Sequence, residues 1–135
     1  MSEYSAFIPL PLPDLNNYTK TSRSPKAGAI MANRVKQDTE AMICLCLPAT
    51  HPDWSYPLRV SFCWHVPNKR KDLDNLAFGQ KFVLDALQKK GIIENDGMNY
   101  IGALHHGFIV DGNIGVEILI EEMEKGEQSW QKKEE

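Results

Sequence analysis

The chain has 135 residues, 42% of them hydrophobic, which is enough apolar content for one compact domain with its own core. A formal net charge of −3 argues against a uniformly basic nucleic-acid-binding protein, but the charges are unevenly spread. Residues 59–90 carry seven Lys or Arg against three Asp, whereas residues 121–135 carry six Glu against three Lys. This distribution predicts nucleic-acid contact at one surface and a solvated acidic tail elsewhere.

The cysteines form neither an even disulfide framework nor a Cys-x-x-Cys zinc pattern. Cys44, Cys46 and Cys63 are therefore expected to be reduced, buried thiols. The sequence shows no signal peptide and no apolar run long enough to span a membrane. We expect a cytoplasmic protein without a membrane partner.

The first half of the chain is expected to form a strand and a helix. Residues 3–10 predict a strand that ends at a proline cluster, and residues 14–23 predict a polar loop. Ser24-Pro25 is a favourable helix start, and Pro48 follows the expected end. Apolar side chains at helical spacing predict one buried face, made of Met31, Val35, Met42, Leu45 and Cys46. A strand at residues 43–47 is the alternative, which the longer periodicity disfavours.

The second half is expected to contain three strands and one helix. Residues 58–66 alternate strictly, which predicts a strand with one apolar face: Leu58, Val60, Phe62, Trp64 and Val66. Residues 75–90 predict a helix that Gly91 ends. Its expected buried positions are Leu76, Phe82, Val83, Ala86 and Leu87. Residues 99–109 and 114–122 predict a hairpin around Asp111-Gly112-Asn113.

The predicted order is therefore β-α-β-α-β-β. Strand-helix-strand units favour parallel pairing, whereas a closing hairpin is antiparallel. We expect an α+β fold in which a mixed sheet packs with two main helices in a single domain. That domain covers residues 1–122, and residues 123–135 form an acidic tail that is expected to be disordered.

Carboxylates and cations cluster at the start of the second predicted helix. The run Asn68-Lys69-Arg70-Lys71-Asp72-Leu73-Asp74-Asn75 precedes that helix, and Asp96 follows it. Three converging carboxylates make a site for Mg²⁺, which prefers hard oxygen ligands. Neighbouring cations neutralise the phosphates that such carboxylates repel. The pattern predicts metal-dependent cutting of nucleic acid, and a helix cap is the alternative for Asp74.

Lys81 lies seven residues after Asp74, which returns it to the same face of a continuous helix. There it could stabilise the charge that develops on a scissile phosphate. The alternative is a solvated pair with Asp85, one helical turn further along. His105 and His106 point to opposite faces of one predicted strand, so they cannot easily share one ion.

The chain resembles a known family in this region. The segment Lys71-Asp72-Leu73-Asp74-Asn75-Leu76, followed by Lys81, Asp85-Ala86-Leu87, Gly91 and Asn95-Asp96, is similar to the signature of RusA-like Holliday-junction resolvases, common in bacteriophages and prophages. The resemblance covers residues 66–100. It implies a Mg²⁺ site, in which Mn²⁺ can substitute, formed by Asp72, Asp74 and Asp96, with Lys81 supporting catalysis.

This sequence departs from the family pattern at two places. The family lysine stands four residues after the second aspartate, where this chain has Phe78. Asn95-Asp96 stands where the family often has two acids, so Asp96 is the main candidate and Glu94 could substitute.

The resemblance implies a homodimeric, Mg²⁺-dependent endodeoxyribonuclease that resolves four-way DNA junctions by paired symmetric nicks, in DNA recombination and repair. The cations expected to hold the DNA backbone are Lys20, Arg23, Lys26, Lys69, Arg70 and Lys71. Two alternatives come from other classes. One is a DNA-binding module without enzymatic activity, and the other is a small metal-dependent phosphoesterase that acts on nucleotides.

Overall fold

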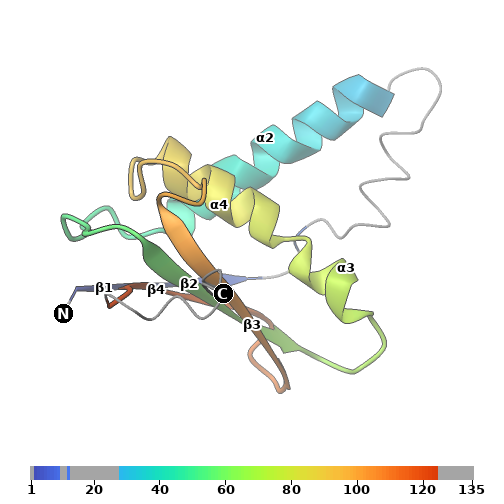
Figure 1. Ribbon diagram of the computed structural model, residues 1–135. Coiled ribbons are helices and arrows are strands. Elements are labelled where there is room, and N and C mark those ends of the chain that lie inside the picture. Colours follow the sequence, from blue (N-terminus) through green and yellow to red (C-terminus); the bar gives the residue numbers. More distant parts are fainter. Residues whose placement is uncertain (1, 10–11, 13–27, 125–135) are drawn as a thin grey trace, which may run out of the picture.

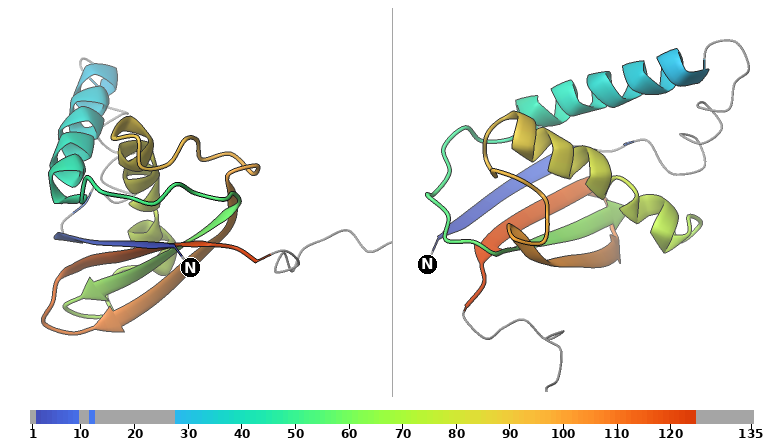
Figure 2. Two further views of the ribbon diagram at one scale, coloured as in Figure 1. Left: turned by 90° about the vertical axis from the view of Figure 1, so that its left-hand side faces the viewer. Right: turned by 45° about the horizontal axis from the view of Figure 1, so that its top comes forward.

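The computed structural model describes residues 2–9, 12 and 28–124. They form one four-stranded sheet with the strand order β1-β4-β2-β3, and helices cover one of its faces (Figures 1 and 2). The elements in chain order are β1 (Glu3–Pro9), α2 (Gly28–Cys46), β2 (Leu58–Val66), α3 (Leu73–Ala77), α4 (Gln80–Lys89), β3 (Ile101–Val110) and β4 (Gly115–Glu122). The predicted α+β class, mixed sheet and single domain are confirmed. Within the described ranges, no helix is both long and apolar enough to cross a membrane.

Strand β2 is central to the sheet. It pairs parallel with β3 on one side and antiparallel with β4 on the other, and β4 also pairs antiparallel with β1. The parallel β2–β3 pair is the arrangement expected across a strand-helix-strand connection. The predicted hairpin is wrong, because β2 lies between β3 and β4. Their connection passes the end of β2, where the Asp111 backbone N–H donates to the Val66 carbonyl at 3.1 Å.

Alternation along β2 places its apolar side chains under the helices, as predicted. Leu58, Val60, Phe62 and Trp64 are each no more than 2% exposed. The Trp64 indole N–H donates to His106 Nδ1 at 2.9 Å, and His106 Nε2 bonds the Gln80 side chain at 2.7 Å. These hydrogen bonds join β2, β3 and the start of α4.

Helix α2 ends before Pro48, as predicted, and the alternative of a strand at residues 43–47 is wrong. The expected start at Ser24-Pro25 lies outside the described residues. The predicted buried face is wrong in part, because Met31 is 46% and Leu45 88% exposed. The residues that the helix buries are Gly28, Ala32, Glu40 and Ile43. This stripe contains a glutamate, so apolar spacing alone selects the wrong face.

The helix predicted over residues 75–90 is divided into α3 and α4 at Phe78 and Gly79. Two backbone bonds there, Gly79 to Leu76 and Lys81 to Phe78, join residues three apart, which is a local 3₁₀ turn. Gly79 is buried against Trp64, where an added Cβ would lie 2.7 Å from the indole ring. The predicted stop at Gly91 is confirmed, with φ at 78° in the left-handed region. Of the expected buried positions, Phe82, Val83, Ala86 and Leu87 are buried, and Leu76 is only half-buried.

Candidate functional site

The basic run lies in the loop that leaves the end of β2. Lys69, Arg70 and Lys71 are exposed, and Asn68 accepts a hydrogen bond from the Arg70 backbone N–H at 2.9 Å. An Asx turn of this kind shapes a loop locally through the asparagine side chain and the backbone. The loop therefore presents its cations to solvent beside the start of α3.

Asp72 and Asp74 lie directly after this run, at the start of α3. Asp72 is the N-cap residue, with extended φ and ψ, and Asp74 belongs to the first turn. Within the described chain, the Asp72 side chain makes no hydrogen bond that caps the helix. Asp74 accepts a hydrogen bond from the Asn75 backbone N–H at 2.9 Å. Both carboxylates are exposed, so they can take an ion or a ligand from solvent.

Asp96 lies at the other end of the sheet. The Glu94 backbone N–H donates to the Tyr56 hydroxyl at 3.1 Å, and the Leu58 N–H donates to the Tyr100 carbonyl at 2.7 Å. These bonds hold the connection around Asp96 beside the start of β2, at the end of α4 remote from α3 (Figure 1). The other two aspartates follow the end of β2. Since β2 has nine residues, its first and last residues are about 26 Å apart. One chain therefore does not bring Asp96 to Asp72 and Asp74.

Lys81 is exposed in the first turn of α4. The expectation that it shares a face with Asp74 assumed a continuous helix, but a 3₁₀ turn lies between them. A 3₁₀ step turns the chain by about 20° more than an α-helical step, so the direction of Lys81 is rotated. Its alternative partner Asp85 instead pairs with Lys36 of α2, at 3.8 Å. The expected DNA-binding residues Lys20, Arg23 and Lys26 lie outside the described residues.

A second group of polar side chains lies on the face of the sheet that the helices leave uncovered. Cys63 and His65 are two residues apart on β2 and so share one face of the strand. Glu117 on β4 is the cross-strand partner of Cys63. One donor atom from each of the three lies within 4.8 Å of the other two. The His65 Nε2 atom contacts the Glu117 carboxylate, and Nδ1 lies 2.7 Å from Asp111 Oδ2.

These contacts change the protonation of the group. The hydrogen bond to Asp111 raises the pKa of His65, and the charge of Glu117 acts in the same direction, although burial opposes them. The hydrogen bond from His65 lowers the pKa of Asp111. Burial, followed by the charges of Glu117 and Asp111, raises the pKa of the Cys63 thiol. Without a bound cation, the group therefore favours a protonated imidazole between two carboxylates.

The sequence predicts Cys63 as a buried thiol and Asp111 as a turn residue, but Cys63 is only half-buried. The turn role is present, because Asp111 Oδ1 accepts the Asn113 backbone N–H at 2.9 Å. The available signal was Cys63-x-His65, which places a thiol and an imidazole on one face of a strand. Glu117 could be added only with the β2–β4 register, which alternation within the strands does not predict.

Comparison with models of known protein families, and with curated proteins, finds no match to this chain.

Proposed function

We propose that the chain is a Mg²⁺-dependent endodeoxyribonuclease of the RusA-like type, which cuts four-way DNA junctions as a homodimer. One observation carries the proposal: Asp72 and Asp74 are exposed and directly follow three exposed cations at the end of β2. Exposed cations bind a phosphate backbone, and adjacent carboxylates bind the ion that phosphoryl chemistry needs. The resemblance over residues 66–100 connects this pattern to junction resolution.

Asp72 and Asp74 fit Mg²⁺ in their chemistry, because both supply hard carboxylate oxygens from an exposed position. When bound, the ion would acidify a water molecule and polarise a phosphate oxygen. Lys69, Arg70 and Lys71 would hold phosphates on either side of the cut. Lys81 would stabilise charge that develops on the phosphate, from the other side of the α3–α4 junction.

The position of Asp96 gives the proposed dimer a chemical role. In one chain, Asp96 lies beyond the opposite end of β2 from the other two aspartates. A two-fold dimer creates two equivalent contacts between different parts of the chain. We infer that Asp96 of one chain completes the site that Asp72 and Asp74 begin in the second chain. Each dimer then carries two complete sites, which paired nicks require.

The test is cleavage of a labelled four-way junction by the purified chain with Mg²⁺, beside linear duplexes of the same arms. We expect paired symmetric nicks in the junction and intact duplexes. Asp72→Asn and Asp74→Asn should each abolish nicking while junction binding is kept or tightened, because each removes a ligand charge that repels phosphates. Asp38→Asn, an exposed aspartate on α2, is the matched control and should cut like the wild type. Parallel loss of binding and cutting would show that the carboxylates are structural.

Complementation tests the shared site. We would mix an Asp72→Asn, Asp74→Asn double variant with an Asp96→Asn variant, each inactive alone. If acids from two chains form each site, mixed dimers hold one complete site and regain single nicks. If each site lies within one chain, the mixture stays inactive. Light scattering should give a mass of about twice the 15.3 kDa chain.

The same assays separate the two other classes. Tight junction binding without any Mg²⁺-dependent cutting would favour a DNA-binding module. Hydrolysis of mononucleotides without junction cutting would favour a phosphoesterase. Either result would overturn the proposed nuclease.

A further inference from the structure

Three different metal-binding side chains meet on the uncovered face of the sheet. Cys63 and His65 are two residues apart on β2, so their side chains leave the same face. Glu117 stands directly opposite Cys63 on the neighbouring strand β4. A thiol sulfur, an imidazole nitrogen and a carboxylate oxygen thus lie within 4.8 Å of one another. Two rigid, paired strands hold these donors, with no loop between them.

His65 is already oriented as a metal ligand. Its Nδ1 atom is hydrogen-bonded to Asp111 Oδ2 at 2.7 Å. This leaves Nε2 directed at the Glu117 carboxylate. Metal-binding histidines usually bond a carboxylate or carbonyl with their other ring nitrogen, which fixes the ring and its tautomer. The His65 side chain is only 9% exposed, so the ring has little freedom to turn.

An apolar wall stands beside the imidazole. The Phe7 ring lies edge-on to His65, with 6.3 Å between ring centroids. The residue opposite His65 on β4 is Gly115, where an added Cβ would overlap the Phe7 ring and lie 2.8 Å from the Ile8 carbonyl oxygen. The glycine therefore lets Phe7 close over this side of the group. Apolar surroundings strengthen the interaction between a cation and its charged ligands.

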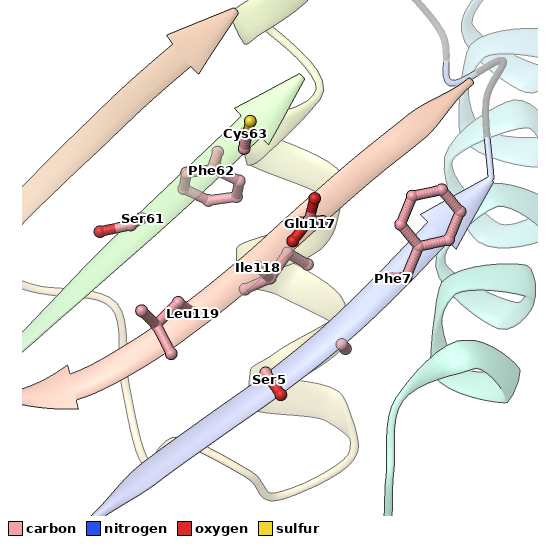
Figure 3. A pocket seen from close by; sticks show the side chains of 9 residues that line it. Ser5, Phe7, Ser61, Phe62, Cys63, Glu117, Ile118 and Leu119 are labelled. Carbon is pink, nitrogen blue, oxygen red and sulfur yellow. The ribbon is translucent and has the colours of Figure 1, made fainter. Parts of the chain in front are cut away.

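We propose that Cys63, His65 and Glu117 bind one Zn²⁺ ion. Zn²⁺ takes thiolate, imidazole and carboxylate ligands together in four-coordinate sites, whereas Mg²⁺ requires oxygen. Three protein ligands leave the fourth position for water or a small ligand. Cys63 and Glu117 also line a hollow of about 560 Å³ on this face of the sheet (Figure 3), from which a fourth ligand could reach them. The Glu117 side chain is 60% exposed, so an ion can reach the group from solvent.

The competing use of these residues is an ion pair without metal. In that arrangement, His65 Nε2 carries a proton that it shares with Glu117, and Cys63 is a spectator thiol. Coordination and this hydrogen bond exclude each other, because the proton that Nε2 donates to Glu117 occupies the lone pair that a metal ion would need. The role of the Cys63 sulfur therefore distinguishes the two arrangements.

The experiment uses the purified full chain, reduced and stripped of metal with a chelator. Titration with Zn²⁺ against a chromophoric competitor should give one ion per chain. Cobalt in place of zinc should give the near-ultraviolet charge-transfer band of a cobalt–thiolate bond. Asp111→Asn, which removes the charge of the His65 partner and leaves one oxygen for the Asn113 backbone N–H, should lower the affinity about 10- to 100-fold. Cys63→Ser should lower it further and remove the band.

The matched control is Cys46→Ser, which changes a half-buried thiol on α2 and should leave both affinity and band unchanged. Asp72→Asn should also leave them unchanged, so this site stands or falls independently of the proposed nuclease. A wild-type chain that binds zinc only substoichiometrically, or that binds cobalt without the thiolate band, overturns the proposal. Because these two readouts need no variant, poor folding of Cys63→Ser cannot rescue it.

Discussion

Replacing Gly79 by alanine tests how closely the α3–α4 junction packs on the core. Gly79 has helical φ and ψ (−58° and −20°), so alanine meets no backbone strain there. Its Cβ would lie 2.7 Å from Trp64 Cη2 and 3.2 Å from Leu12 Cδ1. Trp64 cannot easily move away, because it is 1% exposed and bonded to His106. The junction must therefore rise from the sheet or the core must repack.

The expected size of the effect follows from two opposed terms. Alanine is favoured over glycine by about 1 kcal/mol inside a helix, and by less at a helix end. Overpacking a filled core costs about 1–3 kcal/mol. We expect Gly79→Ala to lower the free energy of unfolding by about 1–2 kcal/mol. It should also weaken the proposed Mg²⁺ binding, because α3 carries Asp74 and moves with the junction.

Urea unfolding followed by far-ultraviolet circular dichroism measures this loss without relying on tryptophan fluorescence. Gly112→Ala is the matched control, because an added Cβ there meets nothing within 4 Å, and its stability should change by less than about 0.5 kcal/mol. A Trp64→Phe background removes the contacted ring atoms, so Gly79→Ala should cost less there. An unchanged or increased stability of Gly79→Ala, or the same cost in both backgrounds, would refute the steric reasoning.

Three further variants test other parts of the structure. Tyr4→Phe should cost about 1 kcal/mol near pH 7, because it removes a buried hydrogen bond. Burial raises the pKa of Tyr4 to about 12 in the folded protein. As pH rises above about 10, the Tyr4 hydroxyl therefore ionises in the unfolded chain before it does in the folded one, and the wild type loses stability. Tyr4→Phe should lack that loss. If the urea midpoints of the wild type and Tyr4→Phe changed equally from pH 9 to about 11, the result would contradict this expectation. Ile43→Ala, at a fully buried site of α2, should cost about 2–5 kcal/mol, whereas Leu45→Ala, which is 88% exposed, should be nearly neutral in the same assay. Lys81→Ala should lower the junction cleavage rate far more than the affinity, with Lys89→Ala as the control at the other end of α4, and normal cutting would remove Lys81 from the proposed site.

Local patterns in the sequence predicted the elements well, because the signals for them lie within a few residues. Strict alternation predicted β2 at the observed bounds, and Gly91 marked the end of α4. These local patterns could not predict which strand β3 pairs with. Alternation shows which side chains face the core, but not which strand lies alongside, so a short turn at Asp111 predicted a hairpin that β2 in fact interrupts. Likewise, the break at Gly79 packs against Trp64, fifteen residues away on another element, and no local pattern predicts that contact.

The same limit applies to the candidate sites. Asp72 and Asp74 are two residues apart at the start of α3, so the sequence alone places them next to the cations that precede them. Asp96 is separated from them by α4. Whether Asp96 lies near the other two aspartates depends on the direction in which α4 runs along the sheet. The structure places the connection that contains Asp96 beside the start of β2. The proposed dimer would bring Asp96 of one chain to Asp72 and Asp74 of the other.

Strand β2 connects the two proposed sites, and its alternation separates their functions. Trp64 faces the helices and supports the α3–α4 junction, and hence the position of Asp74. Cys63 and His65 face away from the helices and meet Glu117 on the open face. Adjacent β2 residues therefore act on different sites: Trp64 variants should disturb the proposed Mg²⁺ site through packing, and Cys63 variants should disturb only zinc. Since the donors differ as well, oxygen at one site and sulfur with nitrogen at the other, each ion has a reason to prefer its own site.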